Sequence, residues 1–65
     1  MDIPAKGDIW SQDDGDYYLF LSEPTYVEDE IIVNAMHLNS GIIVLHHFGI
    51  DPKTGTLYEW WTKVA

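Results

Sequence analysis

No cysteine occurs in this chain of only 65 residues, and that absence constrains the fold more than any motif does. A chain of this length buries only about 60% of the surface that its unfolded form exposes. Small domains often compensate with disulfides or a thiolate-bound metal, and neither can form here. The core must therefore come from dense packing of large apolar side chains, above all the nine aromatic ones. With no repeat or linker in view, we expect one domain over residues 1–65.

The first third of the chain predicts a β-hairpin. Lys6-Gly7-Asp8-Ile9-Trp10 ends in two bulky apolar residues, and the polar segment Asp13-Asp14-Gly15-Asp16 contains an Asp-Gly step that favours a tight turn. The second strand, residues 17–21, is apolar or aromatic at every position, so both of its faces should be partly covered. Pro24 then ends the ladder because proline has no N–H to donate.

The segment from Thr25 to Asn39 has two interpretations. As a helix it has Thr25 as N-cap and a stripe of apolar side chains at helical spacing, which gives an α+β fold of order ββαββ. The members of this stripe are Val27, Ile31, Ala35 and Leu38. As a strand it contains the β-branched run Ile31-Ile32-Val33, followed by a short turn at Asn39 to Gly41. We favour the strand, and with it an all-β fold.

The last third predicts two more strands. Gly41 to Phe48 is β-branched or aliphatic through Leu45 and forms the clearest strand of the sequence. The segment 51–56 contains Pro52 and Gly55, which are typical of a turn. Residues 57–61 should form a closing strand or a short helical turn.

Five short strands that open with Lys6-Gly7-Asp8-Ile9-Trp10 resemble a small SH3-like barrel. The first two strands, with Leu19-Phe20-Leu21-Ser22 as the second, are similar to those of the MazF/PemK-like toxin family, which are endoribonucleases. That family uses an arginine soon after the first strand, and this chain has no arginine. Ribonuclease activity is therefore not implied.

A second resemblance spans more of the chain. Gly7-Asp8-Ile9-Trp10, the apolar segment 17–21, Leu38-Asn39-Ser40-Gly41 and the closing Trp61-Thr62-Lys63-Val64-Ala65 are similar to the layout of small, uncharacterised bacteriophage-encoded proteins. The resemblance implies an origin in a phage or mobile element. It implies no activity.

The charge balance excludes one large class of functions. Three lysines stand against eleven Asp and Glu residues, and the formal net charge is -8. Nucleic-acid binding depends on Lys and Arg neutralising phosphates, so we expect no nucleic-acid partner. The expected partner is another protein with a basic surface.

We also expect a protein that is neither exported nor inserted in a membrane. The opening residues 1–6 are mixed and broken by Pro4, unlike a secretory signal, and the longest apolar run is far too short to span a bilayer. Together with the absence of cysteine, this predicts a cytoplasmic protein, in the host cytoplasm if it is phage-encoded.

Two groups of residues are candidates for binding that partner. The first is the acidic run Glu28-Asp29-Glu30, whose carboxylates could dock on a cationic surface or imitate nucleic-acid charge in a basic groove. The second is Tyr58 with Trp61, because an extended Trp60-Trp61 step places the two indoles on opposite sides and leaves one near the surface. The alternative is that both tryptophans belong to the core and close the barrel.

No residue pattern predicts a cofactor, a metal or an active site. If the turn lies at 39–41, His37 should sit opposite residue 42 or 43. His46 should pair near Val33 or Asn34, about 10 Å further along at roughly 3.3 Å per residue, and His46 and His47 should face opposite sides of a strand. The acidic runs lack the spacing of a calcium loop. Ser40 and the other serines lie in or beside turns, away from any strand-to-helix elbow. We expect a non-enzymatic interaction module, with a structural homo-oligomer, at its smallest a homodimer, as the alternative.

Overall fold

The computed structural model describes residues 3–13 and 15–65, which form an all-β protein without helices. Two of the sequence expectations fall partly outside this range, namely the opening segment 1–6 and the turn that contains Asp14. The described residues form six strands, listed here with their bounds: β1 (Ile9–Gln12), β2 (Tyr17–Phe20), β3 (Thr25–Val27), β4 (Glu30–His37), β5 (Ile42–Gly49) and β6 (Trp61–Lys63).

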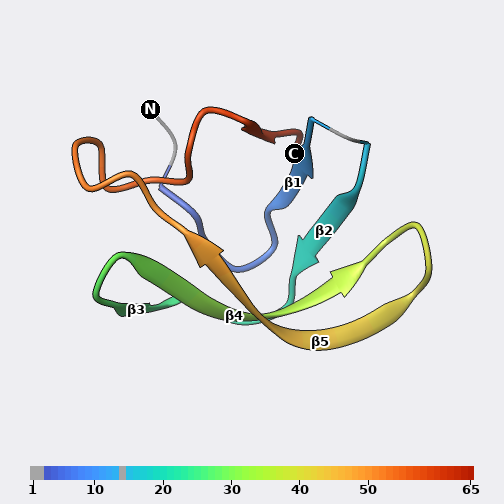
Figure 1. Ribbon diagram of the computed structural model, residues 1–65. Helices are drawn as coiled ribbons and strands as arrows, with labels where there is room; N and C mark the ends of the chain where they lie inside the picture. The colour runs from blue at the N-terminus through green and yellow to red at the C-terminus, as the bar shows by residue number, and fades with distance from the viewer. Residues whose placement is uncertain (1–2, 14) are drawn as a thin grey trace.

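All pairings in the sheet are antiparallel, and β4 organises them. The strand order is β3-β4-β2-β1-β6, and β5 pairs with β4 beside this path. One half of β4 pairs with β3 and the other half with β2, while the whole length of β4 pairs with β5. Figure 1 shows the curved β4–β5 hairpin across the bottom, with β1 and β2 on the right.

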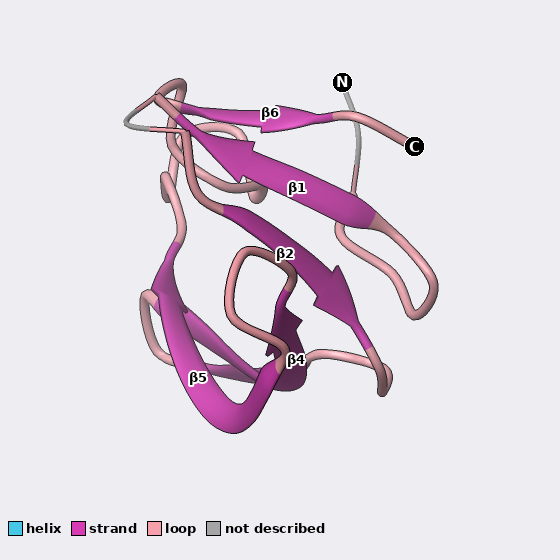
Figure 2. Cartoon of the chain, turned by 90° about the vertical axis from the view of Figure 1, so that its right-hand side faces the viewer, coloured by secondary structure: helices cyan, strands magenta, loops and turns pink. Residues whose placement is uncertain are grey.

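The sheet curls without closing, because the described residues include no ladder between β5 and β6. The segment 50–60 leaves the end of β5, makes an isolated bridge between Ile50 and Leu57, and returns to β6 beside β1 (Figures 1 and 2). Aromatic side chains cross the opening instead. The ring of Phe48 lies 5.0 Å from the indole of Trp61, and that of Tyr18 lies 5.6 Å from it.

The core lies on the inner face of the curled sheet. It consists of apolar side chains from β1, β2, β4, β5 and the segment that follows β5: Trp10, Phe20, Ile31, Val33, Ala35, Phe48, Ile50 and Leu57. Trp10, one of the aromatic residues expected to supply the core, is buried. Only three of the nine aromatic residues are fully buried, so the core relies on aliphatic residues more than the composition indicates.

The all-β prediction is confirmed and the helical alternative over 25–39 is wrong. That segment forms the β3–β4 hairpin, which raises the strand number from the expected five to six. The helical spacing misled because Ile31 and Ala35 are four residues apart, a distance that also fits the two-residue period of a strand. Both are buried on the inner face of β4, whereas the other two members of the helical stripe, Val27 and Leu38, are exposed.

The other strand predictions hold with shifted bounds. The first strand begins at Ile9 instead of Lys6, and the second runs from Tyr17 to Phe20. The closing strand shares only Trp61 with the predicted segment 57–61, since it is Trp61–Lys63 and follows the bridge at Leu57 and a turn at Glu59 and Trp60.

A buried carboxylate explains the Gly-Asp-Ile-Trp sequence that opens the first strand. Asp8 accepts hydrogen bonds from the backbone N–H of Ala5 at 2.9 Å and from the indole Nε1–H of Trp10 at 3.2 Å. The ammonium of Lys63 on β6 lies 3.8 Å from the other carboxylate oxygen. Asp8 therefore satisfies the polar edge of a core tryptophan and ties β6 to the start of β1.

Candidate functional site

The acidic run lies at the tight turn between β3 and β4. Glu28 and Asp29 form the turn, since Val27 pairs directly with Glu30. Glu28 has a φ of 56°, in the left-handed region that is costly for a residue with a Cβ. The backbone carbonyl of Asp29 accepts a hydrogen bond from the N–H of Ile50 at 2.9 Å, which anchors the turn to the end of β5.

The three carboxylates of this turn are in different situations. The Glu30 carboxylate lies 2.8 Å from Nδ1 of His47 on the neighbouring strand. The carboxylates of Glu28 and Asp29 make no hydrogen bond or ion pair with any other described residue, and both residues are exposed. Two of the three predicted carboxylates thus belong to exposed residues and have no partner in the part of the chain that the structure describes.

Tyr58 lies near this turn because its ring packs on a glycine at the end of β5. Glu30 pairs with Gly49 at the end of β5, and a Cβ at Gly49 would lie 3.4 Å from Cε2 of Tyr58. The tyrosine ring therefore packs on the backbone of β5 at the position that is paired with Glu30, the last residue of the acidic run. Trp60 stacks on this ring with centroids 4.6 Å apart and planes within 5°, and it remains 44% exposed.

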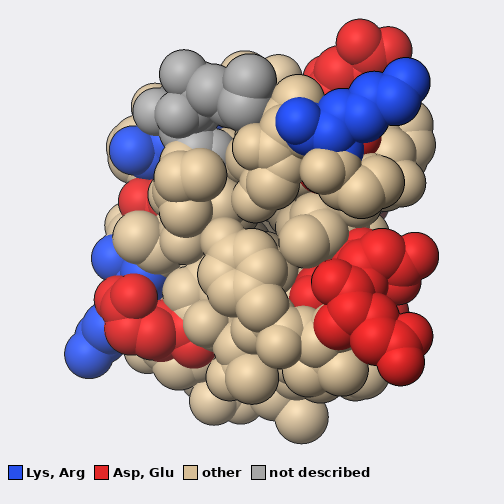
Figure 3. All heavy atoms as spheres, turned by 90° about the vertical axis from the view of Figure 1, so that its left-hand side faces the viewer, with Lys and Arg blue, Asp and Glu red and all other residues tan. Residues whose placement is uncertain are grey.

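These residues form what we call the acidic–aromatic surface: Glu28, Asp29, Glu30, Tyr58 and Trp60. Segments that lie about thirty residues apart in the sequence meet there through the Glu30–Gly49 pair and the Gly49–Tyr58 contact. Figure 3 views the side that carries β3 and the β3–β4 turn, and it shows groups of acidic side chains on either side of an uncharged area.

Trp61 lies elsewhere. The indoles of the Trp60-Trp61 step do differ in exposure, but Trp61 is half-buried and packs against Tyr18 and Phe48, while Trp60 is the exposed one. Its register opposite Gln12 places it on the same face of the sheet as Trp10. Its predicted part in partner binding stays a prediction, and Trp60 is the residue that the sequence reasoning missed.

Trp61 also lines a cavity of about 270 Å³ beside β6. Two indoles, two threonines, an aliphatic side chain and an amine surround it: Trp10, Trp61, Thr56, Thr62, Leu57 and Lys63. Among the predicted partner-binding residues, only Trp61 contributes to it. The cavity and the acidic–aromatic surface are therefore formed by different residues.

Two of the three histidines, His37 and His46, pack against the ring of Tyr18, whereas His47 contacts the Glu30 carboxylate. The predicted register is confirmed: His37 lies opposite Ile42, and His46 lies opposite Val33. His46 packs on the rings of Tyr18 and Phe48, with centroids at 5.3 and 4.4 Å. Burial, and to a smaller extent the neighbouring charge of His47, hold the pKa of His46 below its ordinary value of 6.5. Within residues 3–13 and 15–65, no group of three or more His, Asp or Glu side chains is arranged to hold a metal ion.

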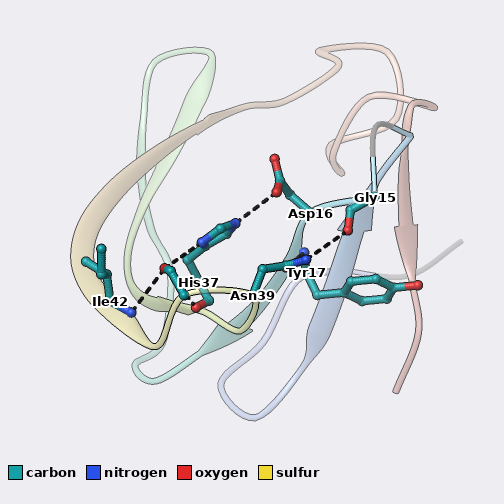
Figure 4. A network of polar contacts seen from close by, with 7 residues as sticks. Gly15, Asp16, Tyr17, His37, Asn39 and Ile42 are labelled. Atoms are coloured by element: carbon teal, nitrogen blue, oxygen red, sulfur yellow. Dashed lines mark hydrogen bonds and ion pairs between the residues drawn. The ribbon is translucent and has the colours of Figure 1, made fainter.

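A polar network that the sequence did not reveal joins the β1–β2 and β4–β5 turns (Figure 4). Nε2 of His37 lies 2.9 Å from the Asp16 carboxylate, and Nδ1 of His37 lies 2.7 Å from Oγ of Ser40. The side chain of Asn39 adds two bonds, accepting from the N–H of Tyr17 at 3.0 Å and donating to the carbonyl of Gly15 at 3.4 Å.

A serine, an imidazole and a carboxylate in this order is also the arrangement by which hydrolases activate a nucleophile. Such catalysis further needs N–H donors aimed at the developing oxyanion. Here the N–H of Gly41 already donates to the carbonyl of His37 at 2.7 Å, and the N–H of Ile42 donates to Oγ of Ser40 at 3.3 Å. We interpret the network as a set of structural hydrogen bonds that hold the two turns together.

The described part of the chain contains no helix long and apolar enough to cross a bilayer. Comparisons with known proteins found no match: no protein-family model, no curated protein and no solved structure matches the chain.

Proposed function

We propose that this chain is a non-enzymatic interaction module that docks on a basic surface of another protein through the acidic–aromatic surface. One observation carries the proposal. Glu28 and Asp29 carry carboxylates that have no partner among the described residues, and their turn leads into Glu30, which is paired with the glycine on which Tyr58 packs, with exposed Trp60 stacked on the tyrosine.

Charge and aromatic side chains would contribute differently to such docking. With a net charge of -8, the chain attracts cationic surfaces over about one Debye length, roughly 8 Å at physiological salt, and this mainly raises the association rate. Tryptophan and tyrosine dominate the residues whose loss costs most at protein interfaces. The carboxylates would steer the encounter, and Trp60 with Tyr58 would hold the complex.

The proposal has a more specific form, which rests on the sequence resemblance alone. In that form the protein is a phage accessory or host-modulating factor, acts in the host cytoplasm, and uses an SH3-like barrel as its scaffold. The acidic turn would then occupy a basic groove of a host protein, including a groove that otherwise holds nucleic acid.

The experiment that tests the proposal compares two double variants of equal charge. Glu28→Gln with Asp29→Asn neutralises the acidic turn, and Asp13→Asn with Glu23→Gln neutralises two exposed acids outside it. Each replaces two of the eleven acids, so their long-range attraction to a cationic partner is matched. Each protein is immobilised and used for affinity capture from host lysate at low and at high salt.

The expected result is a protein retained by the wild type and by the Asp13/Glu23 variant, lost with the Glu28/Asp29 variant, and released by salt. Trp60→Ala should reduce retention of the same protein. Equal retention by both double variants would mean that net charge alone causes the binding, and the proposed surface would be wrong. Retention that survives high salt unchanged would contradict the electrostatic part.

A further inference from the structure

The first half of β5 is apolar and exposed on both of its faces. Its residues Ile42, Ile43, Val44 and Leu45, which we call the apolar edge, are between 41% and 62% exposed. Ile42 and Val44 share the inner face with buried Phe48, and Ile43 and Leu45 lie on the outer face. Four consecutive aliphatic side chains in contact with water are unusual for a surface strand, and they indicate a surface that is covered by a partner.

The backbone of β5 is also available for pairing. Within the described residues, the β5 ladder has β4 as its one partner. The N–H of Ile50 donates to the carbonyl of Asp29, and in an antiparallel ladder the direction alternates from that pair along the strand. The N–H and C=O groups of Ile43, Leu45 and His47 consequently point away from β4. Such an edge is a template for one more strand.

Charge distinguishes the apolar edge from the rest of the chain. Residues 31–50 contain no Asp, Glu, Lys or Arg, although the chain carries a net charge of -8. Glu30, paired with Gly49, lies about 16 Å along β5 from Val44 at roughly 3.3 Å per residue, which is beyond the Debye length at physiological salt. The Asp16 carboxylate near the other end of the hairpin is bonded to His37. A basic partner would find no carboxylate on this strand, whereas a second acidic chain meets its least repulsion here.

We propose that a second copy of this chain docks on the apolar edge, with the two β5 strands paired antiparallel across a two-fold axis. An antiparallel edge is complementary to itself, because the same outward N–H and C=O groups supply donors and acceptors on both sides. The added strand lies about 4.8 Å away and covers the neighbouring aliphatic side chains on both faces of the sheet. The pairing leaves the acidic–aromatic surface uncovered, so the dimer presents two copies of it at opposite ends of the paired strands.

The test is the mass in solution as a function of protein concentration, by light scattering after size exclusion and by sedimentation velocity. The wild type should reach twice the chain mass of 7.5 kDa and dissociate on dilution. Leu45→Lys and Ile43→Lys should each raise the dissociation constant by at least about tenfold, since a lysine on an edge strand opposes pairing. Circular dichroism verifies that each variant keeps its β-structure, and two independent variants guard against a folding defect in one.

The matched control is Val64→Lys. Val64 is 53% exposed and follows β6, a strand that β1 and β2 separate from the β4–β5 hairpin (Figure 2). Like the two β5 variants, Val64→Lys replaces an exposed aliphatic side chain with lysine, but it does so away from the apolar edge. The dissociation constant of the dimer should therefore stay close to that of the wild type. A wild type that stays monomeric at every concentration would overturn the proposal. So would a dimer that Val64→Lys weakens as much as Leu45→Lys does.

Cross-linking gives a second readout, because the chain has no cysteine of its own. Single-cysteine variants at positions 43, 44 and 45 should form disulfide-linked dimers under mild oxidation, fastest at the position nearest the two-fold axis. Val27→Cys, on exposed β3, is the control and should cross-link more slowly. Equal rates at Val27 and at all three β5 positions would show random collision instead of strand pairing.

Discussion

Replacing Glu28 with glycine should stabilise the protein, although it removes a residue of the proposed docking surface. Glu28 has a φ of 56°, the one positive value among the non-glycine residues that the structure describes. A side chain with a Cβ costs about 1–2 kcal/mol in this conformation because the Cβ approaches the following carbonyl oxygen. Glycine has no Cβ and adopts it without this cost.

The expected gain is smaller than the strain, because glycine also makes the unfolded chain more flexible. That flexibility costs roughly 0.5–1 kcal/mol. The net effect of glycine relative to alanine at position 28 should therefore be about 0.5–1 kcal/mol in favour of glycine. For a domain of this size, 1 kcal/mol corresponds to about 4–8 °C in Tm, so Glu28→Gly should melt roughly 2–8 °C above Glu28→Ala.

Asp29 provides the control, since it belongs to the same turn, carries the same charge and is not among the residues with positive φ. There the order should reverse, with Asp29→Gly less stable than Asp29→Ala by about 0.5–1 kcal/mol. Thermal melts and urea titrations of the four variants measure both differences, and each pair removes the same carboxylate. If glycine is no better than alanine at position 28, or equally favourable at both positions, the conformational argument is refuted.

Three further predictions concern polar groups that are buried or hydrogen-bonded inside the protein. Asp8→Ala should lower the free energy of unfolding by about 1–3 kcal/mol in urea titrations, because it leaves the buried indole N–H of Trp10 unpaired; Asp8→Asn, which keeps an acceptor, should lose less. The pKa of His46 is lowered in the folded protein, so the unfolded chain binds the proton more readily. The contribution of neutral His46 to stability is therefore fully present above pH 6.5 and is lost as the pH falls toward the folded-state pKa. His46→Gln should accordingly weaken the fall in Tm between about pH 8 and about pH 5; an unchanged fall would contradict this assignment. Ser40→Ala should leave the rate of p-nitrophenyl acetate hydrolysis at the wild-type level while lowering Tm, whereas a drop in that rate would show that the serine acts as a nucleophile.

Local sequence patterns predicted most of the strands. The apolar segment 17–21, the β-branched run at 31–33 and the segment 41–48 each carry the two-residue period or β-propensity that a strand needs, and all three are strands. The turn at Asn39 to Gly41 then set the register, so His37 lies opposite Ile42 as expected. What the patterns did not predict is β3, because its three exposed residues owe their conformation to pairing with β4.

The candidate site was predictable in composition and not in arrangement. The acidic run is visible in the sequence, but its proximity to Tyr58 depends on the ring packing on Gly49, a contact between segments that no local pattern relates. The choice between Trp60 and Trp61 likewise depends on the register of β6 against β1. The contact between His37 and Asp16 joins residues 21 positions apart, and the spacing of three residues between His37 and Ser40 becomes informative only once the hairpin turn is known.

The two proposed interactions follow from one feature of the chain, the separation of its charges from a long uncharged hairpin. All eleven acids lie outside residues 31–50, so the surface that attracts a cationic protein and the edge that accepts a second copy do not compete for the same residues. Added salt should change the affinities of the two interactions in opposite directions. Screening weakens attraction to a basic partner, while it relieves the repulsion between two chains of charge -8 and leaves the burial of aliphatic side chains intact. A dimer that strengthens with salt would present two acidic–aromatic surfaces at once, and a partner with two basic sites would then bind by avidity, to a degree set by whether its sites match their separation.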